Sequence, residues 1–489
     1  MKMKINTLKN RIIFTLVAFI AISCSDDFVD VTSENANSDN YFNNEEEYQQ
    51  ALIGAYDLLQ ATYLNVMIGE IASDNTLAGG ESANDVVGFQ QIDKMTHTPV
   101  NQQLRDVWNW MFAGVNRANY ILQYQDKTDF SGRNEVIAQA RFLRAYYYFE
   151  LVKFFGAVPL VVDKPLEFGD QFNIGRTPAT EVYDQIEADL IFAADNLPAT
   201  QSQAGRITSG AANALLGKAY LYQGQFSESA AALEKVIAGP YMLETDYASI
   251  FEPEGENGPG SVFEIQYTDK EGAGFGCLQC SEGNVAVGFN GIRNFNGPTF
   301  ESGFSFNVPV QETVDSFEDG DIRKDVAILD IEAFAAQTGA TYVEGYEHTG
   351  YYNRKYIARK GDLNTGDANL TNPNNYRAIR FADVLLMASE ANYKKSPSDE
   401  GKAREYLNRV RVRAQLEPTV LSGNALLEQI YKDRRSELVG EGHRFFDLVR
   451  TGRAAAAIDG FVVGKNELFP IPAIEIQLAG GNWEQNPNY

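Results

Sequence analysis

The stretch SGAANALLGKAYLYQGQFSESAAALEKVIA, residues 209–238, decides the fold because it contains two helix-forming patterns in succession. Its large apolar and aromatic residues recur at helical spacing, which places them on one face of each helix. They are Leu216, Tyr220 and Tyr222, together with Gly217, in the first pattern and Phe226, Leu233 and Val236 in the second. Gly224 lies between the two patterns, where a glycine allows a tight turn. The stretch therefore predicts a hairpin of two helices.

Similar patterns occur elsewhere, so the sequence predicts four helix pairs. In residues 209–238, small, large and aromatic residues alternate with a period of about 34, as in a tetratricopeptide repeat. Stacked pairs of this kind form a right-handed scaffold, because each pair buries a face that it cannot bury alone. The pairs are expected at residues 45–123, 134–197, 209–238 and 379–414, with helices at 45–63, 100–123, 134–155, 177–197, 379–393 and 400–414. The helix at 177–197 is expected to begin with Thr177 as N-cap and Pro178 as its first residue.

Residues 242–375 differ from the rest of the chain, since short aromatic segments there alternate with Gly, Asn and Asp. Within them, residues 263–267 (FEIQY) alternate like a strand. The sequence thus predicts a mostly α-helical fold with one loop-rich region that contains short strands. Loops on a rigid scaffold commonly carry binding residues, so we expect a ligand-binding insert at 242–375.

Two stretches rich in aromatic or charged residues are interpreted as structural. The aromatic residues of 146–155 have helical spacing, which favours packing between helices. In residues 434–453, Arg434, Glu437 and Glu441 recur at spacings of three and four, so they are neighbours on one helix face. Buried arginines need carboxylate partners, and this stretch contains both.

The N-terminus has the pattern of a lipoprotein export signal. Four basic residues precede an apolar run at 12–22 that is too short to span a bilayer, and small residues then lead to Cys24. We expect residues 1–23 to be removed and Cys24 to carry a lipid. Residues 24–44, rich in Asp, Asn and Ser, are expected to form a flexible tether, and residues 45–489 a single domain. The alternative is a cleaved secretory signal with an incidental cysteine.

The chain is acidic, with a formal charge of −25 that becomes −29 once the four basic residues of the signal are removed. Such a charge disfavours nucleic acid and anionic lipid as partners. After the signal, no run of about eighteen apolar residues occurs, so membrane contact is expected through the lipid anchor alone.

The sequence predicts no metal and no cofactor. The three histidines are scattered, and the acidic turn at residues 318–321 lacks the alternating ligands of a calcium loop. Cys277 and Cys280 form a C-x-x-C pair in a glycine-rich stretch, without the second pair that a zinc site needs. We expect a local disulfide between them in an oxidising compartment.

Several motifs resemble the SusD/RagB family of outer-membrane nutrient-binding lipoproteins. In chain order they are RFLRAYYY (141–148), FGAVPLV (155–161), NYR (375–377), RFADVLL (380–386), RRSEL (434–438), GEGHRFFDL (440–448), FPIP (469–472) and QNP (485–487). The resemblance spans nearly the whole chain, and the four helical-hairpin repeats of the family agree with the pairs derived above.

The resemblance implies a SusD-like fold and a surface glycan-binding protein that is not an enzyme. Such a protein caps a TonB-dependent outer-membrane transporter of the SusC type and delivers oligosaccharides to it. The acidic residues that follow Cys24 resemble the signal of the family for display on the outer face of the outer membrane.

Two loops have the composition that sugar binding requires. Sugar rings stack on flat aromatic faces, and sugar hydroxyls bind amides, carboxylates and arginines. Such residues occur together at 73–89 and 275–306. In the family the first loop commonly supplies a stacking aromatic, and Phe89 stands where a Trp is frequent. The ligand-binding residues expected are Asp74, Asn75, Phe89, Phe275, Asn290, Arg293, Phe295 and Phe300.

Three other functions remain open at this stage. Some members of the resembled family bind oligopeptides, and an acidic cleft with few aromatics would favour cationic peptides. A lipid-anchored glycoside hydrolase would need two carboxyl groups about 5 to 9 Å apart across a sugar. A scaffold that holds another protein through its repeats would bind no small ligand.

Overall fold

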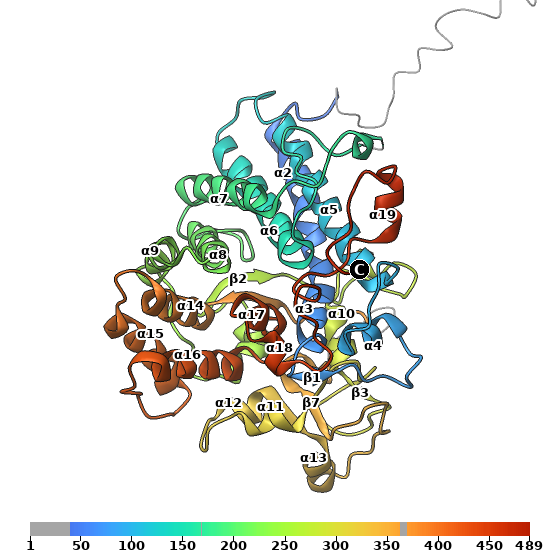
Figure 1. Cartoon of the computed structure of the whole chain (residues 1–489), viewed down its shortest axis with the longest axis vertical. Coiled ribbons are helices and arrows are strands. Elements are labelled where there is room, and N and C mark those ends of the chain that lie inside the picture. The colour runs from blue at the N-terminus through green and yellow to red at the C-terminus, as the bar shows by residue number, and fades with distance from the viewer. Residues whose placement is uncertain (1–39, 168, 362–368) are drawn as a thin grey trace, which may run out of the picture.

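Helices form the N-terminal half and the C-terminal part of the chain, and a loop-rich region lies between them (Figure 1). The computed structural model describes residues 40–167, 169–361 and 369–489. The predicted signal, Cys24 and most of the predicted tether lie outside the described residues. Among the helices described, none has the length and apolar character that a membrane span requires.

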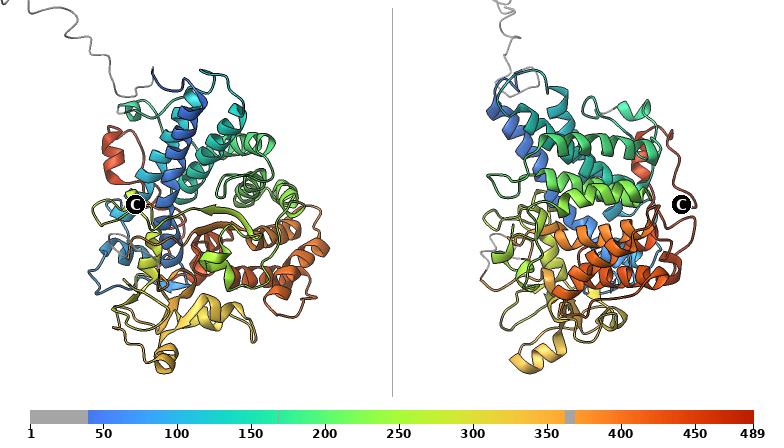
Figure 2. Two further views of the ribbon diagram at one scale, coloured as in Figure 1. Left: turned by 180° about the vertical axis from the view of Figure 1, so that it is seen from behind. Right: turned by 90° about the vertical axis from the view of Figure 1, so that its left-hand side faces the viewer.

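The four predicted helix pairs are present and stack on one another. They are α2 (Glu45–Asp57) with α5 (Gln102–Gln123), α6 (Arg133–Phe155) with α7 (Ala179–Asn196), α8 (Ser209–Tyr222) with α9 (Phe226–Ile237), and α14 (Phe381–Lys394) with α15 (Glu400–Arg413). Consecutive pairs touch through α5 and α6, α7 and α8, and α9 and α14. The right-hand view of Figure 2 shows α7, α8 and α14 in successive layers. The mostly α-helical fold class is confirmed.

The first helix differs from the expected one. The helix predicted at 45–63 is α2, which is followed by the 3-10 turn η2 (Leu58–Thr62) and by a further helix, α3 (Tyr63–Ile71). All of α3 is buried, because it runs through the middle of the molecule beneath the loops. The apolar pattern of this segment therefore continues eight residues beyond the predicted end.

The predicted starts of two other helices were wrong. In each case the first predicted residue is extended, because its backbone pairs with another extended segment. The backbone N–H and C=O of Thr177 bond those of Val158, at N···O distances of 2.9 and 3.2 Å, so Thr177 is extended and α7 begins after Pro178 without a side-chain cap. Ile379 lies in strand β8 (Tyr376–Arg380), which pairs with β2 (Ser261–Ile265), so α14 begins at Phe381.

The remaining elements, most of which are short, lie in the loop-rich region and the C-terminal part, apart from η3, which lies between α6 and α7. They are η3 (Asp170–Phe172), η4 (Ser249–Phe251), η5 (Pro253–Gly255), η6 (Leu278–Cys280), α10 (Val285–Asn290), β3 (Ile292–Arg293), β4 (Ser302–Gly303), β5 (Val308–Pro309), α11 (Gln311–Asp315), α12 (Arg323–Ala327), β6 (Ile328–Asp330), α13 (Ile331–Thr338), β7 (Tyr351–Asn353), η7 (Arg354–Tyr356), α16 (Gly423–Leu438), α17 (Arg444–Arg450), α18 (Ala454–Ala457) and α19 (Ala473–Leu478). With β1 (Thr76–Leu77), the strands form the two-stranded pairs β1–β5, β2–β8, β3–β4 and β6–β7. The short helix α4 (Val87–Asp93) follows β1.

The aromatic residues of α6 pack between helices, as the sequence predicted. Tyr147 and Phe154 are fully buried, and Phe154 stacks on Phe469 near the C-terminus. The core also extends into the predicted tether, since Phe42 is fully buried against Tyr124. The folded body therefore begins at least three residues before residue 45.

Candidate functional site

The charged motifs near the C-terminus form a buried network, which we call the arginine–carboxylate core. Its members are Arg323, Arg380, Arg413, Glu437 and Glu441, from α12, β8, α15, α16 and the turn after α16. Arg380 donates to both acids, at 2.7 Å from each, and Glu437 also accepts from Arg323 and Arg413. Burial raises the pKa of Glu437, but the three surrounding guanidinium groups hold it below its usual range. Every charge here has a buried partner, so the network is part of the packed interior and not an open ligand site.

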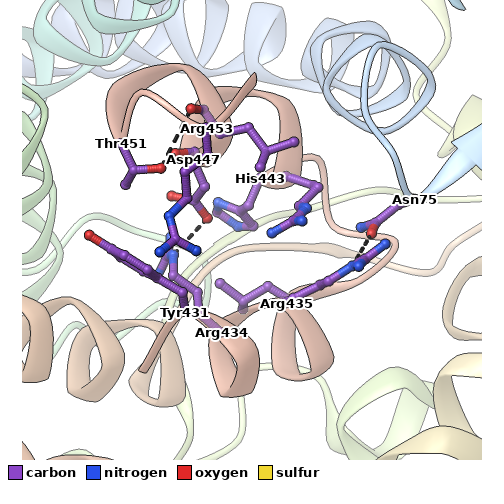
Figure 3. A pocket seen from close by; sticks show the side chains of 11 residues that line it. Asn75, Tyr431, Arg434, Arg435, His443, Asp447, Thr451 and Arg453 are labelled. Carbon is purple, nitrogen blue, oxygen red and sulfur yellow. Dashed lines mark hydrogen bonds and ion pairs between the residues drawn. The ribbon is translucent and has the colours of Figure 1, made fainter. Parts of the chain in front are cut away.

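The pocket beside this network is also structural (Figure 3). Arg434 donates to Asp383 and, at 2.7 Å, to Asp447, while Arg435 donates to Asn75 at 2.8 Å. The pocket has a volume of about 20 Å³, which is room for about one water molecule. A sugar does not fit, so we exclude this pocket as the ligand site. The arginines of residues 434–453 are thus paired with carboxylates, as predicted. The single helix face was predicted wrongly, because α16 ends at Leu438 and Glu441 lies in the turn that follows, where it pairs with Arg380.

Asp74 and Asn75 bind arginines that line the pocket of Figure 3, so they are not part of the loop surface. Asp74 accepts from Arg444 at 2.6 and 2.7 Å, and Asn75 is buried against Arg435. Burial would raise the pKa of Asp74, but the hydrogen bonds and charges of Arg444 and Arg435 lower it. In this conformation both oxygens of Asp74 accept hydrogen bonds from Arg444, and the side-chain oxygen of Asn75 accepts one from Arg435.

Four other expected ligand residues are buried in the core. The ring of Phe89 packs edge-on against Phe289 and Phe306, and Phe295 packs against Phe300. Asn290 accepts a hydrogen bond from Asn307 at 2.8 Å. Phe89, Asn290, Phe295 and Phe300 are each at most 7% exposed. A ring whose faces are covered cannot stack on a sugar, so these aromatics hold the loops in place.

The two remaining expected residues, Phe275 and Arg293, belong to one surface. We call it the loop face and define it by Phe275, Phe304, Arg293, Asp85 and Glu81. Phe275 is 58% exposed, and its ring packs edge-on against the half-buried ring of Phe304 at 5.6 Å. Phe304 in turn stacks on the buried ring of Phe306. A ladder of aromatic rings therefore leads from the core to an open phenylalanine.

Arg293 joins the two predicted loops. Its guanidinium donates to the Asp85 carboxylate at 3.2 Å and to the Phe304 carbonyl at 3.0 Å, and Glu81 lies 3.8 Å away. Glycine permits this approach, because a Cβ at Gly79 would lie 2.1 Å from the Ser305 carbonyl oxygen. The two loops, more than 200 residues apart in the sequence, thus form one polar and aromatic surface.

Sequence reasoning missed Phe304 on this surface and three residues beside it, Lys94, Tyr346 and Glu347. Lys94 donates to the Tyr346 hydroxyl at 2.9 Å and lies 3.6 Å from Glu347. The Tyr346 N–H binds the Gly80 carbonyl, which joins residues 342–348 to the first loop. Phe304 lies in the loop predicted at 275–306, but no pattern distinguished it from its neighbours. Lys94 and Tyr346 are 252 residues apart, so spacing alone gave no signal.

The loop that carries Phe275 is closed by the predicted disulfide, since the structure joins Cys277 to Cys280. The half-buried Leu278, between these cysteines, packs against the core, and the Ser281 hydroxyl donates to the Leu370 carbonyl at 2.9 Å. Glycines on both sides of Phe275 have open space around them. The loop is therefore anchored on the C-terminal side of Phe275, at the disulfide.

Helix hairpins stacked beneath a loop face define a class of α-helical binding proteins, and the comparisons name the family. A model described as "SusD family" matches residues 259–489, and one described as "Starch-binding associating with outer membrane" matches residues 27–221. A solved structure titled "Laminarin binding SusD-like protein" is 36% identical, with 92% of this chain and all of that chain covered and a TM-score of 0.83. The chain belongs to the SusD family.

Two further relatives agree with this assignment. Surface glycan-binding protein A from Bacteroides thetaiotaomicron, solved in complex with laminarihexaose, is 28% identical, with a TM-score of 0.80 and with 91% of this chain and all of that chain covered. A SusD-like protein of Formosa agariphila is 26% identical, with 98% of this chain and all of that protein covered. Both alignments extend over nearly the full length of the present chain.

Proposed function

We propose that this protein binds glycans through the loop face at the surface of the cell that carries it. Laminarin is the first ligand to test. The observation that carries the proposal is the ring of Phe275, which is open to solvent and packs on the half-buried Phe304, which in turn stacks on the buried Phe306. An exposed ring held in this way offers a flat apolar face for a sugar. The relatives whose titles name laminarin or laminarihexaose support this choice of ligand.

Polar groups around Phe275 would supply specificity. Arg293, Asp85 and Glu81 present donors and acceptors on the same surface, and sugar hydroxyls pair with both kinds of group. Arg293 is held by Asp85 and by a backbone carbonyl, so its orientation is fixed before a ligand arrives. Preorganisation of this kind lowers the entropic cost of binding.

We further propose that Cys24 carries a lipid anchor and that residues 24–39 act as a tether. The protein would then face the exterior of the outer membrane and deliver its ligand to a SusC-like TonB-dependent transporter. The family description, which names association with the outer membrane, supports this location. Residues 45–489, with the preceding residues from Tyr41, would act as one domain without enzymatic activity.

The test is native affinity electrophoresis of the protein from Ser25 onward, in gels that contain laminarin or one of a panel of other polysaccharides. A reducing-end assay on the same mixtures separates binding from hydrolysis. Retardation by a glycan without release of reducing ends is the expected result. Release of reducing ends would identify a hydrolase, and retention of cationic peptides with no retardation by glycans would favour the peptide-binding alternative.

A further inference from the structure

A second hollowed surface lies beside the loop that joins α7 to α8. Residues 203–206 of this loop line two hollows, with volumes of about 380 and 460 Å³. We call the two hollows together the cleft. Both volumes fall in the range of small-molecule sites, about 300 to 1,000 Å³. Gly205 seats the loop against the end of β2, because a Cβ there would lie 2.4 Å from the side chain of Gln266.

The first hollow combines an apolar wall with amide and carboxylate groups. Ile53 of α2 is 57% exposed and, with Leu59, lines the apolar side. Gln60 donates to the Gln266 carbonyl and to the Glu282 carboxylate, at 3.1 Å each. Burial and the nearby carboxylate of Asp57 raise the pKa of Glu282, although the hydrogen bond from Gln60 lowers it.

The second hollow adds an aromatic ring. Tyr241 lines it, and its hydroxyl is held by Thr208 at 2.8 Å. Asn257 on the same wall exchanges two amide hydrogen bonds with Gln266, at 3.0 and 3.1 Å. Arg206 lines both hollows, and its Nε donates to Gln203 at 3.1 Å. Like the loop face, the cleft thus combines an aromatic ring, carboxylates and an arginine, and it adds the side-chain amides of Gln and Asn residues.

The cleft and the loop face share one segment of the chain. The turn η6, which holds the disulfide, packs against η2, and η2 contributes the cleft residues Leu59 and Gln60. Phe275 of the loop face and Glu282 of the cleft are seven residues apart, so at most about 25 Å of extended chain separates them. A polymer bound on Phe275 therefore has a second polar surface within reach along the same segment.

We propose that the cleft is a second glycan subsite, which holds the units of a long chain that extend beyond the loop face. The inference rests on the proposed function, because it assigns the same class of ligand to both surfaces. Two linked contacts bind more tightly than either alone, since the second contact forms at high effective concentration. The affinity for a glycan should therefore continue to rise with the length of the glycan, beyond the length that fills the loop face alone.

The test fills the cleft and leaves the loop face unchanged. Ala204 is exposed and lines both hollows, so Ala204→Trp would occupy the space of a sugar. Ala455→Trp, at an exposed position on α18, is the matched control. Calorimetric titrations would use the polysaccharide that retards the wild type most, laminarin first, and the disaccharide of that polysaccharide. Thermal melting would show that each variant folds, and Gln203→Ala would replace Ala204→Trp if the latter did not.

We expect Ala204→Trp to weaken binding of the polysaccharide about tenfold and to leave binding of the disaccharide unchanged. Ala455→Trp should change neither value. Equal affinities of the wild type and Ala204→Trp for the polysaccharide would overturn the inference and leave the proposed function intact, provided that the wild type binds. A wild type that binds no glycan of the panel would contradict the proposed function and the inference together.

Discussion

The arginine–carboxylate core and the loop face use the same residue types for different purposes. In the core, Arg380 and Glu437 are at most 3% exposed and ion-paired on every side. On the loop face, Arg293 shares its charge with a half-buried Asp85 and a largely exposed Glu81. The difference lies in the partners, because every charge of the core is enclosed by buried groups, whereas Arg293, itself 15% exposed, meets Glu81, which is 76% exposed and open to a ligand. An abundance of Arg and Glu in the sequence therefore does not locate a binding site.

The largest effect is expected in the arginine–carboxylate core. Glu437→Gln leaves Arg323, Arg380 and Arg413 buried without the charge that they share, so the free energy of unfolding should fall by about 3 to 5 kcal/mol. Urea denaturation measures this change. Glu81→Gln, which removes the exposed partner of Arg293, should leave the urea midpoint unchanged. Equal losses in the two variants would break the distinction between core and loop face.

The next largest effect is expected at Glu70, a buried acid whose titration should make the stability depend on pH. Burial raises the pKa of Glu70 from 4.5 to about 7, against hydrogen bonds from the Gly442 and Gly440 backbone N–H groups. The folded protein thus retains a proton that the unfolded chain loses, and stability falls as the pH rises from about 4.5 through 7. The loss amounts to at most about 3 kcal/mol.

Glu70→Gln removes this titration and keeps an oxygen for the Gly442 N–H. Between pH 5 and pH 8, the urea midpoint should therefore fall less in the variant than in the wild type. Parallel changes in both proteins would show that Glu70 does not titrate in this range.

The smallest of these effects concerns the loop face. The double substitution Cys277→Ser and Cys280→Ser frees the loop next to Phe275, so this side chain must be ordered on binding. Affinity for the glycan should fall about threefold, because ordering a mobile side chain has an entropic cost. Titration calorimetry of the variant and of the oxidised wild type measures the change. An unchanged affinity would mean that Phe304 alone positions Phe275.

The sequence predicted the helix pairs because their apolar residues recur within each helix. It missed the strand that contains Ile379 because the partner of this strand, β2, is more than 100 residues away, and no local signal records that pairing. No local signal in the sequence showed which loop residues are exposed in the site. Phe275 and Arg293 were named because of the composition of their loop. Phe89 and Phe300 lie in loops of similar composition, but they are buried. Only the folded chain separates rings that hold loops in place from a ring that is open to solvent.

The most direct test of the account compares two exposed phenylalanines. Phe275 lies on the loop face at 58% exposure, and Phe172 lies in η3 at 49% exposure. In affinity gels that contain the polysaccharide bound by the wild type, Phe275→Ala should be retarded less, because its affinity should be about tenfold lower, which corresponds to ~1.4 kcal/mol. Phe172→Ala should migrate like the wild type. Equal retardation of the two variants would contradict the claim that the loop face binds the glycan.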